Sequence, residues 1–109
     1  MSFEQGDIVL VPFPFTTGTS SKPRPAIVVS NTIVNKTQDV ILAQITSKPR
    51  KDIFTYTLDT DKLSVSLNLA SQVRCHKIFI IEKSTIIKKI SKLNDEGITD
   101  LKVKIFSLF

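Results

Sequence analysis

Short runs of apolar, mostly β-branched residues recur along this chain, and proline, glycine or polar residues interrupt them. The first three runs are IVLV at residues 8–11, PAIVVS at 25–30 and DVILAQIT at 39–46. Pro12 and Pro14 end the first run, because proline has no backbone N–H to give to a sheet. Runs of this length and composition are typical of buried strands rather than helices. The chain is therefore predicted to fold around a sheet of short strands.

The second half of the chain predicts more strands. FTYTL at residues 54–58 alternates in side-chain type, as a half-exposed strand does, and residues 69–82 contain at least one further strand. Residues 86–93 fit a short strand about as well as a helical turn. Residues 31–38 are polar and indicate a turn.

The last segment predicts an amphipathic helix. Asn94 is a good N-cap, and Asp95 and Glu96 follow in the first turn, where the helix dipole favours acidic side chains. Apolar residues then recur at spacings of three and four on one helical face, namely Ile98, Leu101, Ile105 and Leu108. Many short strands and one late helix predict a mainly β fold with helices, built as a small, strongly bent sheet or barrel.

The length of 109 residues is that of one domain, and no repeat or linker divides residues 1–109. The longest apolar stretches are far shorter than the roughly 20 residues that span a bilayer. The N-terminal residues lack the features of a signal peptide, and Cys75 is the only cysteine. We therefore expect a cytoplasmic protein with no membrane association and no intrachain disulfide.

The net charge of +5 favours an anionic partner. His76 is the only histidine, so no Cys/His cluster can hold zinc, and no phosphate-binding glycine motif is present. A Ser-His-Asp triad stays open, because its members converge only in space. If the protein is an enzyme, we expect it to need no metal and no cofactor. Arginine, hydroxyl and imidazole groups suit phosphodiester chemistry, because arginine matches the charge on nonbridging phosphate oxygens.

Arg24 stands between Pro23 and Pro25, at the start of the run at 25–30. Each proline fixes its own φ, and the residue before a proline is held in extended geometry. The residues alone allow two interpretations of Arg24. It is either an exposed arginine at the start of a strand or a cation on stiff backbone aimed at an anionic ligand.

Four blocks together resemble the MazF/PemK toxin family of type II toxin–antitoxin systems, and they cover nearly the whole chain in order. They are GDIVLVPFPFT at residues 6–16, KPRPAIVVSN at 22–31, DVILAQITS at 39–47 and the run at 72–95. Members of this family are sequence-selective endoribonucleases. The resemblance implies an SH3-like β-barrel with a C-terminal α-helix and a homodimer. It also implies single-stranded RNA as the substrate and a cognate antitoxin protein as a partner.

The resemblance implies residue roles as well. The arginine of the family's RP motif falls on Arg24, and the threonine that ends the family's third strand falls on Thr46. In the family these two positions carry most of the catalysis. The RNA 2′-hydroxyl would attack phosphorus and leave a 2′,3′-cyclic phosphate and a 5′-hydroxyl. Arg24 would stabilise the transition-state phosphate, and Thr46 would help position it.

His76 departs from the family pattern. Some members carry an acidic residue two places after the arginine that corresponds to Arg74, and use it as an acid or base; here that place is His76. Imidazole titrates near neutral pH, so His76 is the third catalytic candidate. The substrate-binding candidates are the polar residues around these positions: Lys22, Asn31, Ser47, Lys48, Gln72 and Arg74. Gln72 and Arg74 either contact RNA or pair within the fold.

Other interpretations stay open. The chain could be a catalytically silent module on the same barrel that binds RNA or an antitoxin, or a topoisomerase poison like CcdB, which shares this fold. The RP and ITS blocks favour the nuclease, because they carry the ribonuclease chemistry. Phe13 and Phe15 either stack on bases or pack in the core or a dimer contact. The basic loop at 47–52 either lines the RNA path or is simply solvated.

Overall fold

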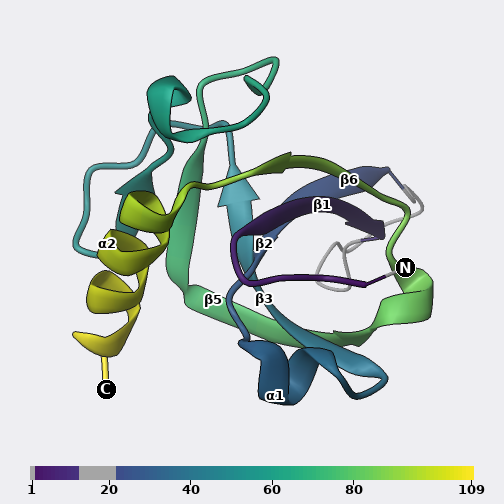
Figure 1. Cartoon of the computed structure of the whole chain (residues 1–109). Coiled ribbons are helices and arrows are strands. Elements are labelled where there is room, and N and C mark those ends of the chain that lie inside the picture. Colours follow the sequence, from purple (N-terminus) through teal and green to yellow (C-terminus); the bar gives the residue numbers. More distant parts are fainter. Residues whose placement is uncertain (1, 13–21) are drawn as a thin grey trace.

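A single antiparallel sheet dominates the computed structural model, which describes residues 2–12 and 22–109 (Figure 1). Within these residues the strands are β1 (Asp7–Pro12), β2 (Pro23–Val28), β3 (Asp39–Thr46), β4 (Thr55–Thr57), β5 (Gln72–Glu82) and β6 (Lys88–Lys92). Their order across the sheet is β4-β5-β3-β2-β1-β6. The α-helices are α1 (Thr32–Asn35) and α2 (Asp95–Phe106), and short 3₁₀ turns lie at Thr60–Lys62 and Lys83–Thr85.

The strands predicted from the apolar runs are confirmed, and β3 matches its predicted bounds at both ends. The ambiguous segment at 86–93 forms β6, which pairs with β1. The prediction of a plain turn at 31–38 is incomplete, because this segment contains α1. Asn31 caps that helix, since its side chain accepts a hydrogen bond from the backbone N–H of Ile33 at 3.0 Å.

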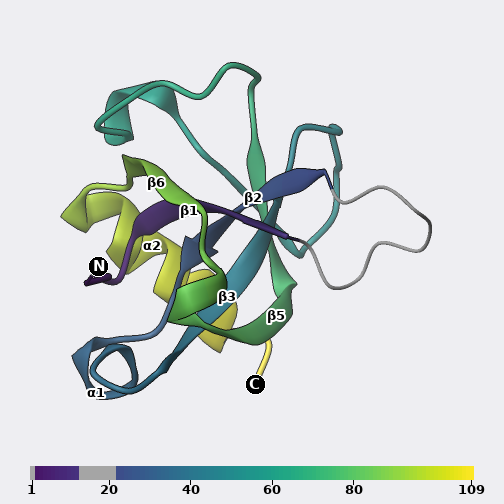
Figure 2. The same ribbon diagram turned by 90° about the vertical axis from the view of Figure 1, so that its right-hand side faces the viewer.

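The sheet curls until the chain that follows β4 meets β6 (Figures 1 and 2). Leu63 forms an isolated antiparallel bridge with Leu93. The backbone N–H of Ser64 donates to the carbonyl of Lys92 at 2.9 Å. These contacts join the two ends of the sheet into a barrel-like shape. The predicted mainly β, SH3-like barrel with a C-terminal helix is confirmed in this form.

Two apolar clusters occupy the two faces of the curled sheet, because successive strand side chains point to opposite sides. One cluster lies between the sheet and α2 and includes Ile8, Ile27, Ile45, Val73, Cys75, Leu93, Leu101 and Ile105. The other includes Phe3, Val9, Val11, Val28, Leu42, Phe79 and Ile86. The strands at the centre are therefore covered on both faces, and the sheet forms a rigid base for the side chains at its ends.

Helix α2 confirms the sequence-based prediction in detail. Asn94 is its N-cap, and its side chain accepts from the N–H of Gly97 at 2.8 Å. Leu101 and Ile105 on the predicted apolar face are buried in the core. No helix in residues 2–12 and 22–109 is long and apolar enough to cross a membrane.

Candidate functional site

The register of the sheet brings predicted residues from three strands into one row. Ala26 of β2 pairs with Gln44 of β3, and this is the last pair between the two strands; Arg24 and Thr46 lie two residues beyond it, at the same end. On the other side of β3, Thr46 pairs with Gln72 of β5. Residues directly opposite one another on neighbouring strands point to the same face. Thr46 and Gln72 are therefore neighbours, and alternation along β2 sets Arg24 on the same face at the same end; we call these three residues the Arg24–Thr46 row.

Arg24 is exposed at the start of β2. Its partner on the other side is Val11 of β1, which is fully buried, so the backbone beneath Arg24 belongs to the packed sheet. Within the described part of the chain, no carboxylate or carbonyl pairs with its guanidinium. A guanidinium stays charged at neutral pH and presents a planar fork of donors. The arrangement can thus bind a phosphate without first breaking an internal ion pair.

Thr46 ends β3 and begins the turn that follows. Its Oγ1 accepts from the backbone N–H of Lys48 at 3.1 Å. The Thr46 oxygen is therefore used as an acceptor, which orients the hydroxyl group. The hydroxyl proton has no acceptor among the described residues. Thr46 can therefore donate a hydrogen bond to an anionic oxygen beside Arg24. Ser47 and Lys48 follow it and are exposed.

Gln72 anchors the basic loop at 47–52. Its Oε1 accepts from the backbone N–H of Arg50 at 3.1 Å, which ties this loop to β5. The cationic side chains of the loop are all exposed: Lys48, Arg50 and Lys51. This loop directly follows Thr46 in the chain. Cations therefore gather on the same end of the sheet as the Arg24–Thr46 row.

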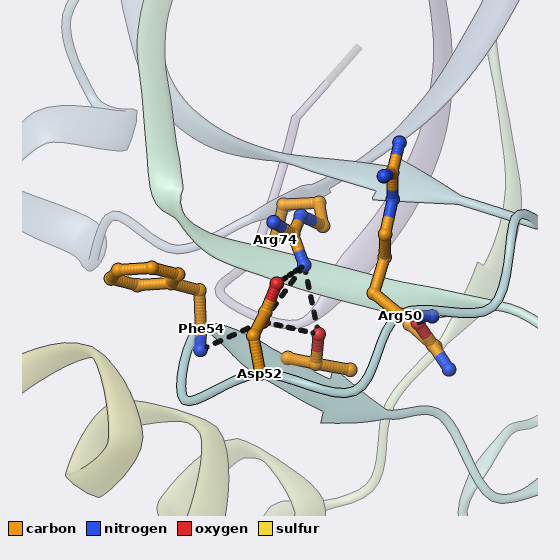
Figure 3. Close-up of polar contacts among 6 residues, drawn as sticks. Arg50, Asp52, Phe54 and Arg74 are labelled. Atoms are coloured by element: carbon orange, nitrogen blue, oxygen red, sulfur yellow. Dashed lines mark hydrogen bonds and ion pairs between the residues drawn. The ribbon is translucent and has the colours of Figure 1, made fainter.

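Arg74 is paired within the fold, which is one of the two alternatives that its sequence context left open. Its Nη1 donates to both carboxylate oxygens of Asp52, at 3.0 and 3.1 Å, and to Thr55 Oγ1 at 2.8 Å (Figure 3). Arg74 is buried, with 8% of its surface exposed. Asp52 was not singled out from the sequence. The one signal that pointed to it is local, because an aspartate just before a strand often forms a turn by accepting from the backbone N–H two residues later.

Asp52 is charged at neutral pH. Partial burial raises the pKa of its carboxyl, but hydrogen bonds from Thr55 and Arg74 outweigh that effect and hold the pKa below its ordinary value. The backbone N–H of Phe54 also donates to Oδ1 at 3.0 Å. The carboxylate therefore connects the basic loop to the start of β4 and to β5.

His76 lies in a bulge of β5, apart from the Arg24–Thr46 row. Ala43 pairs with Ile78 but the next residue, Gln44, pairs with Arg74, so Cys75, His76 and Lys77 have no paired partner on β3. His76 is four positions along the chain from Gln72, the partner of Thr46, which is at most about 13 Å of extended strand. The structure thus brings His76 to Arg74 rather than to Arg24.

The imidazole of His76 is exposed but stacks against Phe54, with ring centroids 4.1 Å apart and planes inclined by 31°. Partial burial lowers the pKa of His76 below its ordinary value. The positive charges of Arg74 and Lys77 lower this pKa further, against an opposing effect of Asp52. The ring is therefore neutral at pH 7 and can accept a proton.

The other residues predicted from the sequence lie in different places. Asn31 caps α1, beyond the far end of β2, so it does not join the Arg24–Thr46 row. Lys22 is exposed and directly precedes β2, two residues before Arg24. Phe13 and Phe15 lie outside the described residues. Among the residues described, no group of three or more His, Cys, Asp or Glu side chains could hold a metal ion.

One hollow among the described residues is remote from this chemistry. It has a volume of about 690 Å³ and lies at the opposite end of β1 and β2 from Arg24. Its walls come from the N-terminal segment, α1 and the start of α2, and include Phe3, Asn31, Lys36, Lys92, Ile98 and Lys102. The catalytic candidates lie instead on the exposed end of the sheet, where an extended polymer has access.

A family model described as "PemK-like, MazF-like toxin of type II toxin-antitoxin system" matches residues 4–109. The chain therefore belongs to this family of toxins. A search of curated proteins gives no match.

Several solved structures are similar in fold. A mycobacterial endoribonuclease in complex with its cognate antitoxin is 15% identical, covers 97% of this chain and 93% of its own, and gives a TM-score of 0.78. The Mycobacterium tuberculosis toxin MazF-mt6 is 20% identical over 93% of each chain, with a TM-score of 0.74. MazF from Deinococcus radiodurans is 19% identical over 99% of this chain and 96% of that one, with a TM-score of 0.77. The TM-scores establish a shared fold, and at these low identities the residues of this chain must carry any argument about its chemistry.

Proposed function

We propose that the protein is a metal-independent endoribonuclease that cleaves single-stranded RNA within a short sequence motif, as the toxin of a toxin–antitoxin pair in the cytoplasm. The observation that carries the proposal is that Arg24 and Thr46 share one face at the same end of two neighbouring strands. The guanidinium and the hydroxyl proton have no partner among the described residues, so both are available to one phosphate. The similar fold of a mycobacterial endoribonuclease supports the proposal.

In the proposed reaction the RNA 2′-hydroxyl attacks the adjacent phosphorus and the bond to the 5′-oxygen breaks. The products are a 2′,3′-cyclic phosphate and a 5′-hydroxyl. Arg24 donates to the nonbridging oxygens and stabilises the charge that grows there. Thr46 donates its O–H to a phosphate oxygen or positions the 2′-hydroxyl. His76 or Arg74 assists the proton movement or the binding; the imidazole is neutral, but the bulge of β5 sets it apart from the Arg24–Thr46 row, so Arg74 is the nearer of the two.

The exposed cations around the Arg24–Thr46 row support a polyanionic substrate. Lys48, Arg50 and Lys51 belong to the loop that Gln72 anchors to β5, and Lys22 precedes Arg24. Such cations contact backbone phosphates and release counterions, which gives affinity without reading sequence. The RNA would run along this end of the sheet past Thr46.

A homodimer and an antitoxin partner belong to the same proposal. Helix α2 exposes Val103 and Phe106, three residues apart on one side, and Phe109 follows with 94% of its surface exposed. Exposed apolar surface of this kind marks contacts between proteins. The antitoxin complex of the similar mycobacterial endoribonuclease supports a partner of this class. An acidic antitoxin segment would complement the net positive charge.

The test is a cleavage assay with purified protein, a mixed RNA substrate and a chelator. Wild type is expected to cleave, and Arg24→Ala is not. Cleavage that needs added metal, or equal cleavage by both proteins, would contradict the proposed mechanism. Binding of RNA by both proteins without cleavage would favour the silent binding module. Inhibition of a DNA topoisomerase in the absence of RNA cleavage would favour the CcdB-like alternative.

A further inference from the structure

The ion pair between Asp52 and Arg74 occupies only one edge of the arginine. Every hydrogen bond that Arg74 makes among the described residues comes from Nη1. No buried side-chain nitrogen or oxygen in those residues lacks a partner. The Nε and Nη2 atoms have no partner there, and 8% of the surface of Arg74 stays exposed. Arg74 is thus held firmly by one nitrogen and can still donate from the others.

The open edge of Arg74 belongs to the proposed RNA face. Arg74 follows Gln72 by two residues on β5, so both side chains point to the same side of the sheet. Gln72 is the partner of Thr46, and Arg74 is the partner of Gln44. The guanidinium therefore lies one step along the strand from the Arg24–Thr46 row, where the next phosphate of an extended RNA could reach it.

Asp52 is badly placed to act as a base and well placed to fix its neighbours. Its Oδ1 accepts from the N–H of Phe54, the hydroxyl of Thr55 and Nη1 of Arg74, and Oδ2 accepts from Nη1 as well. A carboxylate with its lone pairs used in this way has little capacity left for a substrate proton. Its lowered pKa also makes it a weak base. Its effect on RNA must pass through the groups that it holds.

We propose that Asp52 is a positioning residue for RNA. It holds Arg74 with the free guanidinium edge turned toward a backbone phosphate beside the scissile one, and it fixes the end of the basic loop next to that phosphate. This inference rests on the proposed ribonuclease function. Preorganised donors of this kind raise affinity because the arginine loses little side-chain freedom when the phosphate binds.

The experiment measures kcat and KM on a short fluorogenic RNA for Asp52→Asn, Arg74→Gln and the double variant. Asn keeps an amide oxygen for Phe54 and Thr55 but removes the charge that holds Arg74. Asp52→Asn is expected to raise KM roughly tenfold, as loss of a charge-assisted hydrogen bond does, while kcat changes by less than about twofold. In the Arg74→Gln background the same substitution is expected to have no further effect on KM. Asp61→Asn, an equal charge change on the exposed turn at 60–62, is the control and keeps the wild-type KM.

Arg74→Lys gives a second measurement if Asp52→Asn is poorly folded. Lysine keeps an ion pair with Asp52 but has no second edge of donors, so KM is expected to rise while the thermal midpoint stays near that of wild type. An unchanged KM in Asp52→Asn or Arg74→Lys would overturn the inference. An equal rise in KM from Asp52→Asn with and without Arg74 would also overturn it, because the aspartate would then act only through the loop. A wild-type protein that neither cleaves nor binds RNA would remove the proposed function itself, and this inference with it.

Discussion

Gly97→Ala is a sharp test of how α2 packs on the sheet, because two effects of known size oppose each other there. Gly97 lies in the first turn of α2, and alanine is favoured over glycine in a helix by about 1 kcal/mol. A Cβ at this position would lie 2.5 Å from Cδ1 and 2.6 Å from Cγ of Leu93. Leu93 is fully buried and bridges to Leu63, so it has little room to move away.

Overpacking of this kind costs about 1–3 kcal/mol. We expect the clash to exceed the gain in helix propensity, so Gly97→Ala should destabilise the protein by about 1 kcal/mol. For a chain of this size that lowers the midpoint of thermal unfolding by roughly 4–8 °C. The measurement is calorimetry or circular dichroism at constant protein concentration. Thr99→Ala, at an exposed position of the same helix, is the control for propensity alone.

A double-variant cycle identifies the cause. In Leu93→Ala the clashing atoms are absent, so adding Gly97→Ala should then be neutral or stabilising. Leu93→Ala alone should cost about 2–5 kcal/mol, because it leaves a cavity in the core. A higher midpoint for Gly97→Ala in the wild-type background would refute the close approach of α2 to Leu93, on which the packing of this cluster depends.

The remaining predictions concern the site. Lys48→Ala should weaken RNA binding and reduce the slope of log affinity against log salt by about 0.7, as expected for one lost phosphate contact to a single strand; an unchanged slope would place Lys48 off the RNA path. If His76 accepts the proton, cleavage by wild type should rise as the pH rises through its lowered pKa and then level off, and His76→Ala should lose that limb; two identical profiles would exclude this role. Because the folded pKa of His76 lies below the unfolded one, its contribution to stability should fall as the pH falls from 7 to 5, and His76→Ala should flatten that part of the stability profile measured by urea unfolding. Thr46→Val should lower kcat more than it raises KM, since it removes a donor to the reacting phosphate.

Local chemistry explains why much of the fold could be predicted. Strand β3 lies within its predicted bounds because β-branched residues fill it and polar residues flank it. The start of α2 is encoded by Asn94 and the acidic residues after it, all within one turn. One-turn helix α1 was missed because a single capped turn has the composition of a loop.

The site was only partly predictable, because its geometry depends on pairing between distant segments. The sequence and the family resemblance pointed to Arg24 and Thr46, but their place on one face at the same end of the sheet follows from the register of β2 on β3. The bulge that sets His76 apart likewise depends on the pairing of β5 with β3. Asp52 and Arg74 are 22 residues apart, and no local pattern joins them. Asn31 belonged to a matching block, yet its side chain is used to cap α1.

The central claim is that Arg24 acts on the reacting phosphate beside Thr46, and the most direct measurement compares wild type with Arg24→Lys. Single-turnover cleavage of one RNA in chelator gives the rate, mass spectrometry gives the product ends, and a substrate with 2′-deoxyribose at the cleavage position gives the affinity without reaction. Lysine keeps the charge but loses the planar fork, so the rate should fall by about 100-fold or more while affinity changes little. The wild-type products should carry a 2′,3′-cyclic phosphate and a 5′-hydroxyl. Equal rates for the two proteins, or products with a 5′-phosphate, would contradict the account.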